Sequence, residues 1–426
     1  VSTPRATRRP PARYTRTTMT PRERIRAALD FQPTDRTPRD LAGMRSTGIS
    51  AFAYADLVRA LGLPPRPPRV YDVGQMLALP ERDVLDALGC DVVPVEMDEC
   101  TNAFDEPEKW RPYDFGGRLE ALVRAPDAFA VEPDGTVTAA KSGRAGDPHD
   151  LRMPTGSTVF DEAHGGQPID FSGDLPKVDL DRFRDERTAA VVTPERAREI
   201  GAYCARAREA TDRAIMFNGI SAGLGYPDGL ANWSMLCMTD PDYVHAYHEI
   251  VTDAAVRQVE TLLPEIASSV DILMLNADDQ GLQDRTILPP DLFRELYLPY
   301  YRKVTEAVHR VAPGVKRFLH SCGAVYDLIE DFAACGFDVL NPVQWPAGGH
   351  SPAEWKARAG SRIAFWGGGV NTQSTLPLGT VAEVEAEVRE TVAILAQGSG
   401  FVFCAIHNIL AEIPGDKVVA MYRAVE

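Results

Sequence analysis

The sequence predicts an α/β protein, a single (β/α)8 barrel of the TIM type with extra helices on its N-terminal side. From about residue 190 onward, short apolar runs alternate with amphipathic helices, a pattern typical of parallel strands joined by crossover helices. Six such runs occur there, and a seventh near residues 91–95 favours a closed barrel over the alternative, an open doubly wound sheet. With 426 residues, the chain is long enough for a barrel of ordinary size plus additional helices.

The chain is predicted to consist of a tail, residues 1–18, and a barrel domain, residues 19–426. The tail contains five Arg and no acid, as mitochondrial presequences do, but its prolines interrupt any apolar helical face, so we expect it to be disordered. Thr20 to Glu23 then supply a helix N-cap, a Pro in the first turn and an acid, which predicts a helix ending near Phe31.

The remaining elements follow from hydrophobic spacing and turn residues. Residues 97–185 are rich in Gly, Pro and Asp and are predicted to form a long loop-rich insertion, with a hairpin strand at 136–140 after the turn pair Asp134-Gly135. No Gly-rich phosphate fingerprint follows any predicted strand, which argues against a dinucleotide-binding protein. The predicted strands are 91–95, 214–217, 272–275, 317–319, 339–340, 363–366 and 401–403, and the predicted helices are 51–62, 81–89, 240–263, 291–312, 324–335 and 380–397.

Composition narrows the function classes. The formal net charge of −16 opposes binding to phosphate backbones, so nucleic acid is not an expected partner. No stretch approaches about 18 consecutive apolar residues, so no membrane span is expected. The seven cysteines lack the dense spacing of a disulfide scaffold, which favours a reducing cytoplasm.

The most specific local pattern is Phe318-Leu319-His320-Ser321-Cys322-Gly323, where a predicted strand ends and a helix follows. Residues two apart in an extended chain point to one side, so His320 and Cys322 face together. An imidazole and a thiolate at the C-terminal rim of a barrel make half of a zinc site. The alternative is a packed core His beside a buried Cys.

A third ligand must come from elsewhere, and the last predicted strand supplies two candidates. His407 lies just past the strand, on the rim where functional side chains occur. Cys404 lies within the apolar run 401–406 and is the alternative ligand, although its place in the strand favours packing. In a closed barrel the final strands lie near one another around the axis, so both residues can reach the 320/322 pair.

Carboxylates and amides follow other strands. Asp278 and Asp279, with Gln280, come after an apolar run and could bind a cation, orient a substrate amine or act as general base. The alternative is a helix N-cap and a turn. Glu96 and Asp98, after the early strand, are further candidates for catalytic carboxylates or for solvated loop charge.

Two further histidines, His245 and His248, lie at i, i+3 in an amphipathic helix. No third metal ligand accompanies them, so they are interpreted as a helix surface.

The chain resembles the uroporphyrinogen decarboxylase superfamily, and within it the methyltransferases that act on corrinoid and thiol carriers. The similar segments follow the family order along nearly the whole chain, with 100–190 least recognisable. They are TPRERIRAALDFQPTDRTPRD at 20–40, TGISAFAYADLVRALGL at 47–63, ADDQGLQDRTILPPDLFRELYLPYY at 277–301, FLHSCGAVYDLIEDFAACGFDVLNPVQ at 318–344, FWGGGVNTQSTLPLGT at 365–380 and HNILAEIPGDKVVAMYRAV at 407–425.

In that branch, the resemblance implies a zinc ion held by an HxC pair and a late Cys, which activates a thiol that accepts a methyl group. His320 and Cys322 fall on the pair, and His407 falls on the late ligand, with Cys404 three residues too early. The branch often has a Glu where this chain has Gln344. The decarboxylases proper need no metal and bind substrate carboxylates through an arginine-rich segment. That motif is absent at 38–45 in this chain. Arg39 and Arg45 in this segment are the candidate residues for binding a substrate carboxylate.

Three hypotheses follow. The first is a zinc-dependent methyltransferase whose methyl acceptor is a corrinoid, a thiol or a folate. In it, a carboxylate would move a proton or orient the small-molecule substrate, and the candidates are Asp278, Asp279 and Glu96. The residues expected to bind the substrate are Arg39, Arg45, Gln280 and Gln344. Because no corrinoid-binding loop is evident in the chain, any corrinoid would arrive on a partner protein. The second is a metal-independent decarboxylase of a carboxylic acid or tetrapyrrole. The third is a docking module that presents a corrinoid protein to another subunit.

Overall fold

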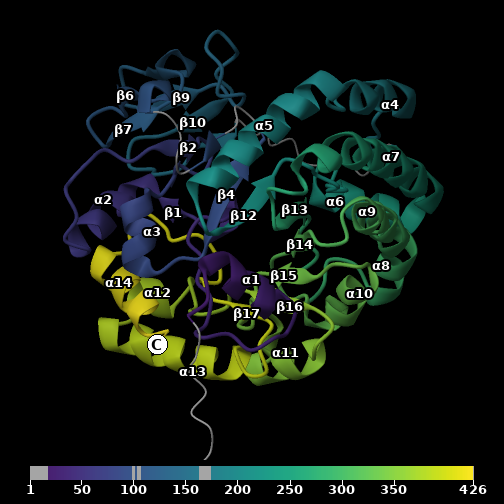
Figure 1. Cartoon of the computed structure of the whole chain (residues 1–426). Coiled ribbons are helices and arrows are strands. Elements are labelled where there is room, and N and C mark those ends of the chain that lie inside the picture. The colour runs from purple at the N-terminus through teal and green to yellow at the C-terminus, as the bar shows by residue number, and fades with distance from the viewer. Residues whose placement is uncertain (1–17, 98–100, 103–106, 163–173, 426) are drawn as a thin grey trace, which may run out of the picture.

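A computed structural model describes residues 18–97, 101–102, 107–162 and 174–425, so the predicted disordered tail and Asp98 lie outside the described residues except for residue 18. Among the described residues, seven parallel strands form one curled sheet (Figure 1). In spatial order they are β4 (Val92–Glu96), β12 (Ala214–Asn218), β13 (Ile272–Ala277), β14 (Lys316–His320), β15 (Val339–Asn341), β16 (Ala364–Trp366) and β17 (Phe401–Val402). The short β5 (Thr101–Asn102) adds to β4 in antiparallel fashion. The seven predicted apolar runs all coincide with these parallel strands.

Helices surround the sheet and connect successive strands (Figure 1). Because consecutive strands are parallel, each connection must cross back outside the sheet, and the amphipathic helices bury their apolar sides against it. These outer helices are α5 (Pro194–Ala210), α7 (Pro241–Ile266), α8 (Pro290–Leu296), α9 (Leu298–Val311), α10 (Ile329–Ala334), α11 (Pro352–Ala359), α13 (Val381–Leu395) and α14 (Gly415–Arg423). The predicted helix 291–312 is two helices, and the predicted helix 324–335 consists of the 3-10 turn η5 (Tyr326–Leu328) followed directly by α10.

The inside of the curled sheet is a separate core. Alternate residues of each strand point inward, and they form a cluster that includes Val92, Met216, Phe318, Trp366 and Cys404. The next inward positions, at the carboxyl ends of the strands, are polar: Glu96, Asn218, His320 and Asn341. The apolar core therefore ends in a polar layer at one end of the barrel.

The segment 38–40 lies between the first and last parallel strands. The Phe403 N–H donates to the Pro38 carbonyl at 2.8 Å, and the Asp40 N–H donates to the Phe403 carbonyl at 2.8 Å. On the other side, the Asp91 N–H donates to the Arg39 carbonyl at 2.8 Å. Backbone hydrogen bonds therefore run from the β17 side of the sheet through this segment to the β4 side.

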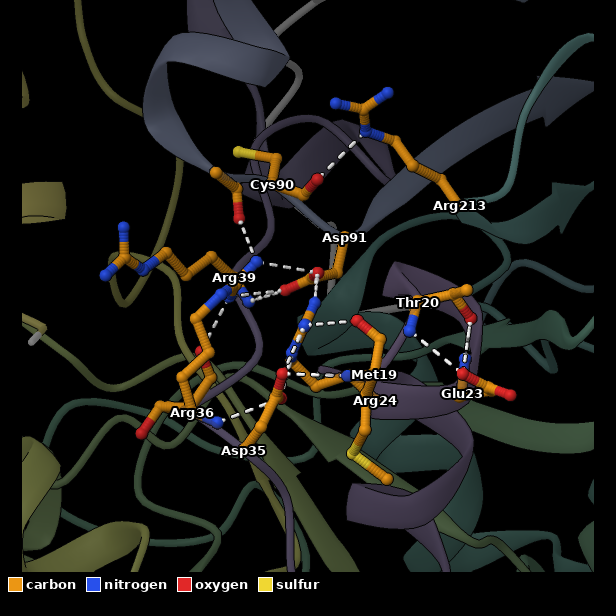
Figure 2. Close-up of polar contacts among 12 residues, drawn as sticks. Met19, Thr20, Glu23, Arg24, Asp35, Arg36, Arg39, Cys90, Asp91 and Arg213 are labelled. Atoms are coloured by element: carbon orange, nitrogen blue, oxygen red, sulfur yellow. Dashed lines mark hydrogen bonds and ion pairs between the residues drawn. The ribbon is translucent and has the colours of Figure 1, made fainter. Parts of the chain in front are cut away.

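A buried ion-pair network holds the N-terminal helix α1 (Pro21–Leu29) across the amino-terminal ends of the strands (Figure 2). The capping box predicted by Thr20 and Glu23 is formed. Asp91, whose side chain is fully buried, accepts hydrogen bonds from Arg24 at 2.5 Å and from Arg36 at 2.8 Å. It also accepts the Arg39 N–H at 2.9 Å. One carboxylate thus ties α1 and the 36–39 segment to the start of β4.

The predicted loop-rich insertion is wrong for much of its length. Turn residues are frequent there because the strands are short, and the region folds as β-sheet beside the barrel (Figure 1). A hairpin joins β6 (Arg111–Asp114) and β7 (Glu120–Val123), and a four-stranded antiparallel sheet has the order β11-β10-β9-β8. Its strands are β8 (Phe129–Val131), β9 (Val137–Ala139), β10 (Leu151–Met153) and β11 (Asp161–Glu162). The hairpin strand predicted at 136–140 corresponds to β9.

The remaining elements flank the barrel. The predicted helices near its start are α2 (Ala51–Ala60) and α3 (Arg82–Leu88), and β1 (Ile49–Ser50), β3 (Leu77–Ala78) and β2 (Val70–Asp72) form a small sheet beside them. Others are α4 (Leu180–Ala189), α6 (Leu230–Thr239), α12 (Thr375–Leu378) and the short 3-10 turn η1 (Arg45–Thr47). Among the described residues, no helix combines the length and apolar character needed to cross a membrane.

Candidate metal centre

His320 and Cys322 meet at the carboxyl end of β14. His320 is the last strand residue and is buried, while Cys322 follows in the loop and is partly exposed. The Cys322 Sγ lies 3.2 Å from His320 Nε2. Gly323 makes this turn possible, because its φ is +89° and a Cβ there would lie 2.3 Å from the Gly281 backbone. The pair predicted from the sequence is therefore brought together.

His407 completes a three-residue group. The candidate ligand atoms of His320, Cys322 and His407 all lie within 4.8 Å of one another, a spacing that suits one metal ion. His407 lies in the segment after β17, which is anchored by hydrogen bonds between Ile409 and the backbone of Gly48 and Ser50. Cys404 is not part of this group. It is buried in the inner core of the barrel, and burial raises the pKa of its thiol well above the usual range.

Asn341 fixes the orientation of the His320 ring. The Asn341 side-chain N–H donates to the Trp366 carbonyl at 2.9 Å, so its Oδ1 faces His320 Nδ1 at 2.6 Å. An amide oxygen only accepts, so Nδ1 carries the hydrogen and Nε2 keeps a free lone pair on the side of Cys322. A hydrogen-bonded second ring nitrogen is the usual state of a metal-binding histidine.

The two histidines are neutral and can bind a cation, whereas the Cys322 thiol stays protonated unless a cation is bound. Burial lowers the pKa of His320, and burial together with His320 lowers the pKa of His407 to about 4, so both rings are neutral ligands near pH 7. Burial and the nearby Asp279 carboxylate raise the pKa of Cys322. A cation among these atoms would reverse that shift, because it favours the thiolate. Two neutral imidazoles and a partly exposed thiol therefore fit zinc.

The two adjacent acids have different places. Asp278 is buried and accepts the Leu224 N–H at 2.8 Å, the Gly225 N–H at 3.0 Å and the Tyr301 hydroxyl at 2.7 Å. These contacts support a loop and leave little of the carboxylate for a substrate. Asp279 is half exposed, accepts the Cys322 N–H at 2.8 Å and lies 3.8 Å from His320 Nε2. Only Asp279 faces the candidate ligands.

The two glutamines also differ. Gln344 Oε1 accepts the Gly323 N–H at 2.8 Å, so it holds the loop that carries Cys322. Gln280 is buried, with its backbone N–H on the Ser321 hydroxyl and its side chain near the Tyr301 hydroxyl. Gln344 lines the cavity described below, and Gln280 does not.

The arginine candidates lie at opposite ends of the barrel. Arg45 lies beside the site and contacts Glu96 at 3.2 Å and Asp72 at 3.0 Å. The Arg39 side chain donates to the Leu88 carbonyl at 3.2 Å. The Arg39 backbone N–H donates to Asp91, at the amino-terminal start of β4 (Figure 2). Since the candidate ligands lie at the carboxyl ends of the strands, Arg39 is not brought to this site, which corrects the expectation that it binds substrate there.

A cavity of about 460 Å³ adjoins the candidate ligands. Its wall includes Cys322, His407 and Asp279, and the rest of the wall combines uncharged polar residues with apolar ones such as Leu282, Ile406 and Leu410. The carboxamide residues in it are Gln283, Gln344, Asn371, Gln373 and Asn408. Among the described residues that line it, none is Lys or Arg.

Two residues of the site, Asn341 and Ser46, were not predicted from the sequence. One residue outside the site, His248, was predicted at the wrong depth. Asn341 follows an apolar run and pairs with His320 in the strand register, which was an available signal. Ser46, whose hydroxyl lies 3.4 Å from His320 Nε2, had no such signal because it reaches the site from a distant turn. His248, interpreted as surface, is fully buried against aromatic rings of α6 and the segment 297–300.

Known proteins that are similar to this chain include decarboxylases and methyltransferases. Residues 224–426 match the family model described as uroporphyrinogen decarboxylase (URO-D). A uroporphyrinogen decarboxylase of Anaeromyxobacter sp. (strain Fw109-5) is 27% identical over 201 residues, 47% of this chain and 53% of the relative. The methylcobamide:CoM methyltransferase MtaA of Methanosarcina barkeri is 28% identical over 156 residues, 36% of this chain and 42% of the relative. The chain thus spans about half the length of the curated relatives it matches.

The fold itself has a solved counterpart. A methyltransferase from Methanosarcina mazei superposes with a TM-score of 0.50 and 18% identity, over 95% of this chain and 98% of that one. At this identity the likeness concerns the fold alone, and it supports a TIM-like α/β architecture for the curled parallel sheet. On these matches, the chain is similar to the uroporphyrinogen decarboxylase superfamily over residues 224–426 and resembles its methyltransferase-like branch.

Proposed function

We propose that the protein is a zinc-dependent methyltransferase that moves a methyl group between a small-molecule donor and a corrinoid, thiol or folate acceptor. The observation that carries this proposal is the convergence of His320, Cys322 and His407 within 4.8 Å at the wall of a cavity. Three protein ligands with an open position are what catalytic zinc sites have in common. When bound, zinc would supply Lewis acidity and would favour the deprotonated form of a thiol.

The chain's own residues prepare this site. Asn341 keeps the hydrogen of His320 on Nδ1, so the Nε2 lone pair is directed to the ligand group. Asp279 and Gln344 each accept a backbone N–H of the 322–323 loop, which fixes the backbone that carries Cys322. Asp279, half exposed in the cavity wall, is the carboxylate that we propose receives or delivers a proton at the substrate. Asp278 positions the 224–225 loop and stays clear of the reacting atoms.

The cavity wall favours a ligand without many negative charges. Five carboxamides and one carboxylate line it, and none of its described lining residues is Lys or Arg. A substrate with several carboxylates needs cationic partners, because carboxylates removed from water are costly unless they are paired. This composition therefore supports a neutral or amide-rich ligand over a polycarboxylate tetrapyrrole.

A corrinoid on a partner protein is the acceptor or donor that we propose from the relatives. The name of the Methanosarcina barkeri relative includes methylcobamide. We place the enzyme in the cytoplasm, since the described cysteines 90, 204, 237, 322, 335 and 404 are all free thiols. We also infer that the segment 38–40 takes the place of an eighth barrel strand, because it bonds to both neighbours of the gap.

The second candidate is a metal-independent decarboxylase, favoured by the names of the uroporphyrinogen decarboxylase relatives. Arg45, the nearer of the two anchors expected for a carboxylate substrate, is already held by Asp72 and Glu96, which speaks against it.

One experiment separates the two functions. The isolated chain, purified without chelators, is assayed for transfer of methyl from a methylated corrinoid to a small thiol before and after dialysis against EDTA. Methyl transfer that is lost on chelation and restored by zinc supports the first function. Carbon dioxide release from a candidate acid in EDTA, without methyl transfer under any condition, contradicts it and favours the decarboxylase.

A further inference from the structure

A second polar cluster lies beside the candidate metal centre, at the carboxyl ends of β4 and β12. Glu96 and Asn218 are direct partners in the parallel pairing of these strands, so their side chains point to the same inner side. The Asn218 side-chain N–H donates to Glu96 Oε1 at 2.8 Å. Arg45, in the η1 turn, contacts the other oxygen of Glu96 at 3.2 Å. Glu96, Asn218 and Arg45 thus form one connected group.

Asn218 presents a hydrogen-bond acceptor that no described residue uses. Its amide orientation is fixed, because Nδ2 donates to two acceptors, the Gly43 carbonyl at 3.2 Å and Glu96 Oε1. Turning the amide over would place an oxygen against both of them. Asn218 Oδ1 is therefore shielded from solvent without a hydrogen-bond partner among the described residues. A buried acceptor left unpaired is costly, and a ligand that carries an N–H group removes that cost.

The charge around this acceptor is negative. Arg45 is shared between Glu96 and Asp72, so two carboxylates face one guanidinium. The Tyr71 hydroxyl is buried and has no partner among the described residues. Burial and the carboxylates of Glu96 and Asp72 raise the pKa of Tyr71 well above its usual range, so it stays a neutral hydroxyl. Among the described residues, this acceptor-rich group has two carboxylates and one guanidinium, and it suits a cationic N–H donor better than a carboxylate.

The cluster and the metal centre adjoin through one turn. In η1, Arg45 reaches Glu96, and the next residue, Ser46, places its hydroxyl 3.4 Å from His320 Nε2. Asn218 and His320 lie on strands separated only by β13, which puts their backbones about 10 Å apart. A substrate of a few non-hydrogen atoms is therefore long enough to reach from one to the other.

We propose that Asn218 and Glu96, with Tyr71 beside them, form a subsite for the N–H donor end of the small-molecule substrate, an ammonium group or an equivalent cationic nitrogen. This inference rests on the proposed function, since the other end of the substrate would lie at His320, Cys322 and His407. Arg45 positions Glu96 and is not a carboxylate anchor.

The test uses the zinc-loaded full chain and matched thiol probes measured by calorimetry. The probes are ω-aminothiols with two to four carbons, the hydroxythiols of the same length and the mercaptocarboxylic acids of the same length. We expect an aminothiol to bind about tenfold or more tightly than its hydroxythiol counterpart, because an extra charge-assisted hydrogen bond distinguishes them. The mercaptocarboxylic acids should bind most weakly.

Two variants assign the preference to the subsite. Asn218→Ala and Glu96→Gln should each remove most of the aminothiol preference and leave hydroxythiol affinity unchanged, a split that a general loss of folding would not give. Gln397→Ala, an exposed amide after α13, is the control and should keep the preference. Equal binding of amino- and hydroxythiols by the wild type, or a preference that survives both variants, overturns the subsite.

Failure of the proposed function gives a different result. If the cobalt-substituted protein develops no thiolate absorption with any probe, the thiol-binding metal centre is refuted. The subsite is then decided with propylamine and propanol, which carry no thiol. If propylamine binds more tightly than propanol and Asn218→Ala abolishes this difference, the subsite is supported. If the two bind equally to the wild type, the subsite is overturned.

Discussion

His320 donates its Nδ1 hydrogen to Asn341 Oδ1 across 2.6 Å, and the Asn341 amide is itself locked by the Trp366 carbonyl. The two residues are register partners on β14 and β15, so the hydrogen bond is built into the sheet. It leaves one nitrogen of His320 free, on the side of Cys322 and His407. The tautomer of the first candidate ligand is therefore fixed by a neighbouring strand.

Removing this hydrogen bond should weaken metal binding. Asn341→Leu should lower the affinity for zinc by roughly 10- to 100-fold, the usual effect of losing a residue that orients a ligand. Asn341→Asp keeps an acceptor for Nδ1–H and should retain most of the affinity. Zinc transfer to a colorimetric chelator measures both variants. Equal affinity of Asn341→Leu and the wild type would show that Asn341 does not orient a ligand.

Substitutions of the two adjacent acids should have different effects, one on stability and the other on turnover. Asp278→Ala leaves the buried Leu224 N–H, the partly buried Gly225 N–H and the Tyr301 hydroxyl without an acceptor, so urea denaturation should show a loss of roughly 1–3 kcal/mol in the free energy of unfolding. Asp279→Ala removes a half-exposed side chain and should change stability by less than about 0.5 kcal/mol. Turnover should instead fall in Asp279→Ala. A large loss of stability in Asp279→Ala with normal turnover would reverse these roles.

His248 should make the fold sensitive to acid. Burial lowers its pKa to about 3 from the usual 6.5, and the rings of Trp233, Tyr297 and Tyr300 surround it with no carboxylate among these contacts. The unfolded chain therefore binds this proton at higher pH than the folded protein does, and stability is lost as pH falls from about 6.5 toward 3.

Melting temperatures between pH 7 and pH 5 test this directly. His248→Gln should show a smaller decline than the wild type across that interval, whatever its melting temperature at pH 7. His309→Gln, at an exposed position of α9, is the control and should follow the wild type. Parallel curves for His248→Gln and the wild type would mean that His248 is not the group that titrates.

The Asp91 network should be a major source of stability. Asp91→Ala leaves the buried Arg24 without one of its carboxylate partners and should cost roughly 3–5 kcal/mol in the free energy of unfolding. The exposed pair Arg182–Glu186 on α4 is the control, and Glu186→Ala should cost under about 1 kcal/mol. Chemical denaturation of both variants gives the comparison, and similar small losses in both would refute the structural role of the network (Figure 2).

The parallel strands were predictable because each is a short apolar run between amphipathic helices, a local signal. The β-sheets of the 107–162 region were not, since strands such as Phe129–Val131 and Leu151–Met153 are three residues long and are stabilised by pairing with distant segments. Hydrophobic spacing also could not separate a buried His248 from a surface one, because tertiary contacts decide which side of a long helix is covered.

The sequence predicted which residues of the site follow a strand. It did not predict which of them face the cavity and which support a loop. His320, Cys322 and His407 were chosen as metal ligands by their place at strand ends, and they converge. That assignment stays a prediction until the metal is measured. The strand β13 is irregular between Met274 and Asn276, and this irregularity affects which of Asp278 and Asp279 faces the cavity. The sequence pattern alone does not predict the irregularity.

The most direct test of the central claim is the zinc content of protein purified without chelators, compared among the wild type, His407→Ala and Cys404→Ser. A single three-ligand site should give about one equivalent in the wild type. His407→Ala should lower zinc content and activity together, while Cys404→Ser, altered within the inner core, should retain the metal. A wild-type content below about half an equivalent would contradict the account, as would loss of zinc in Cys404→Ser with retention in His407→Ala.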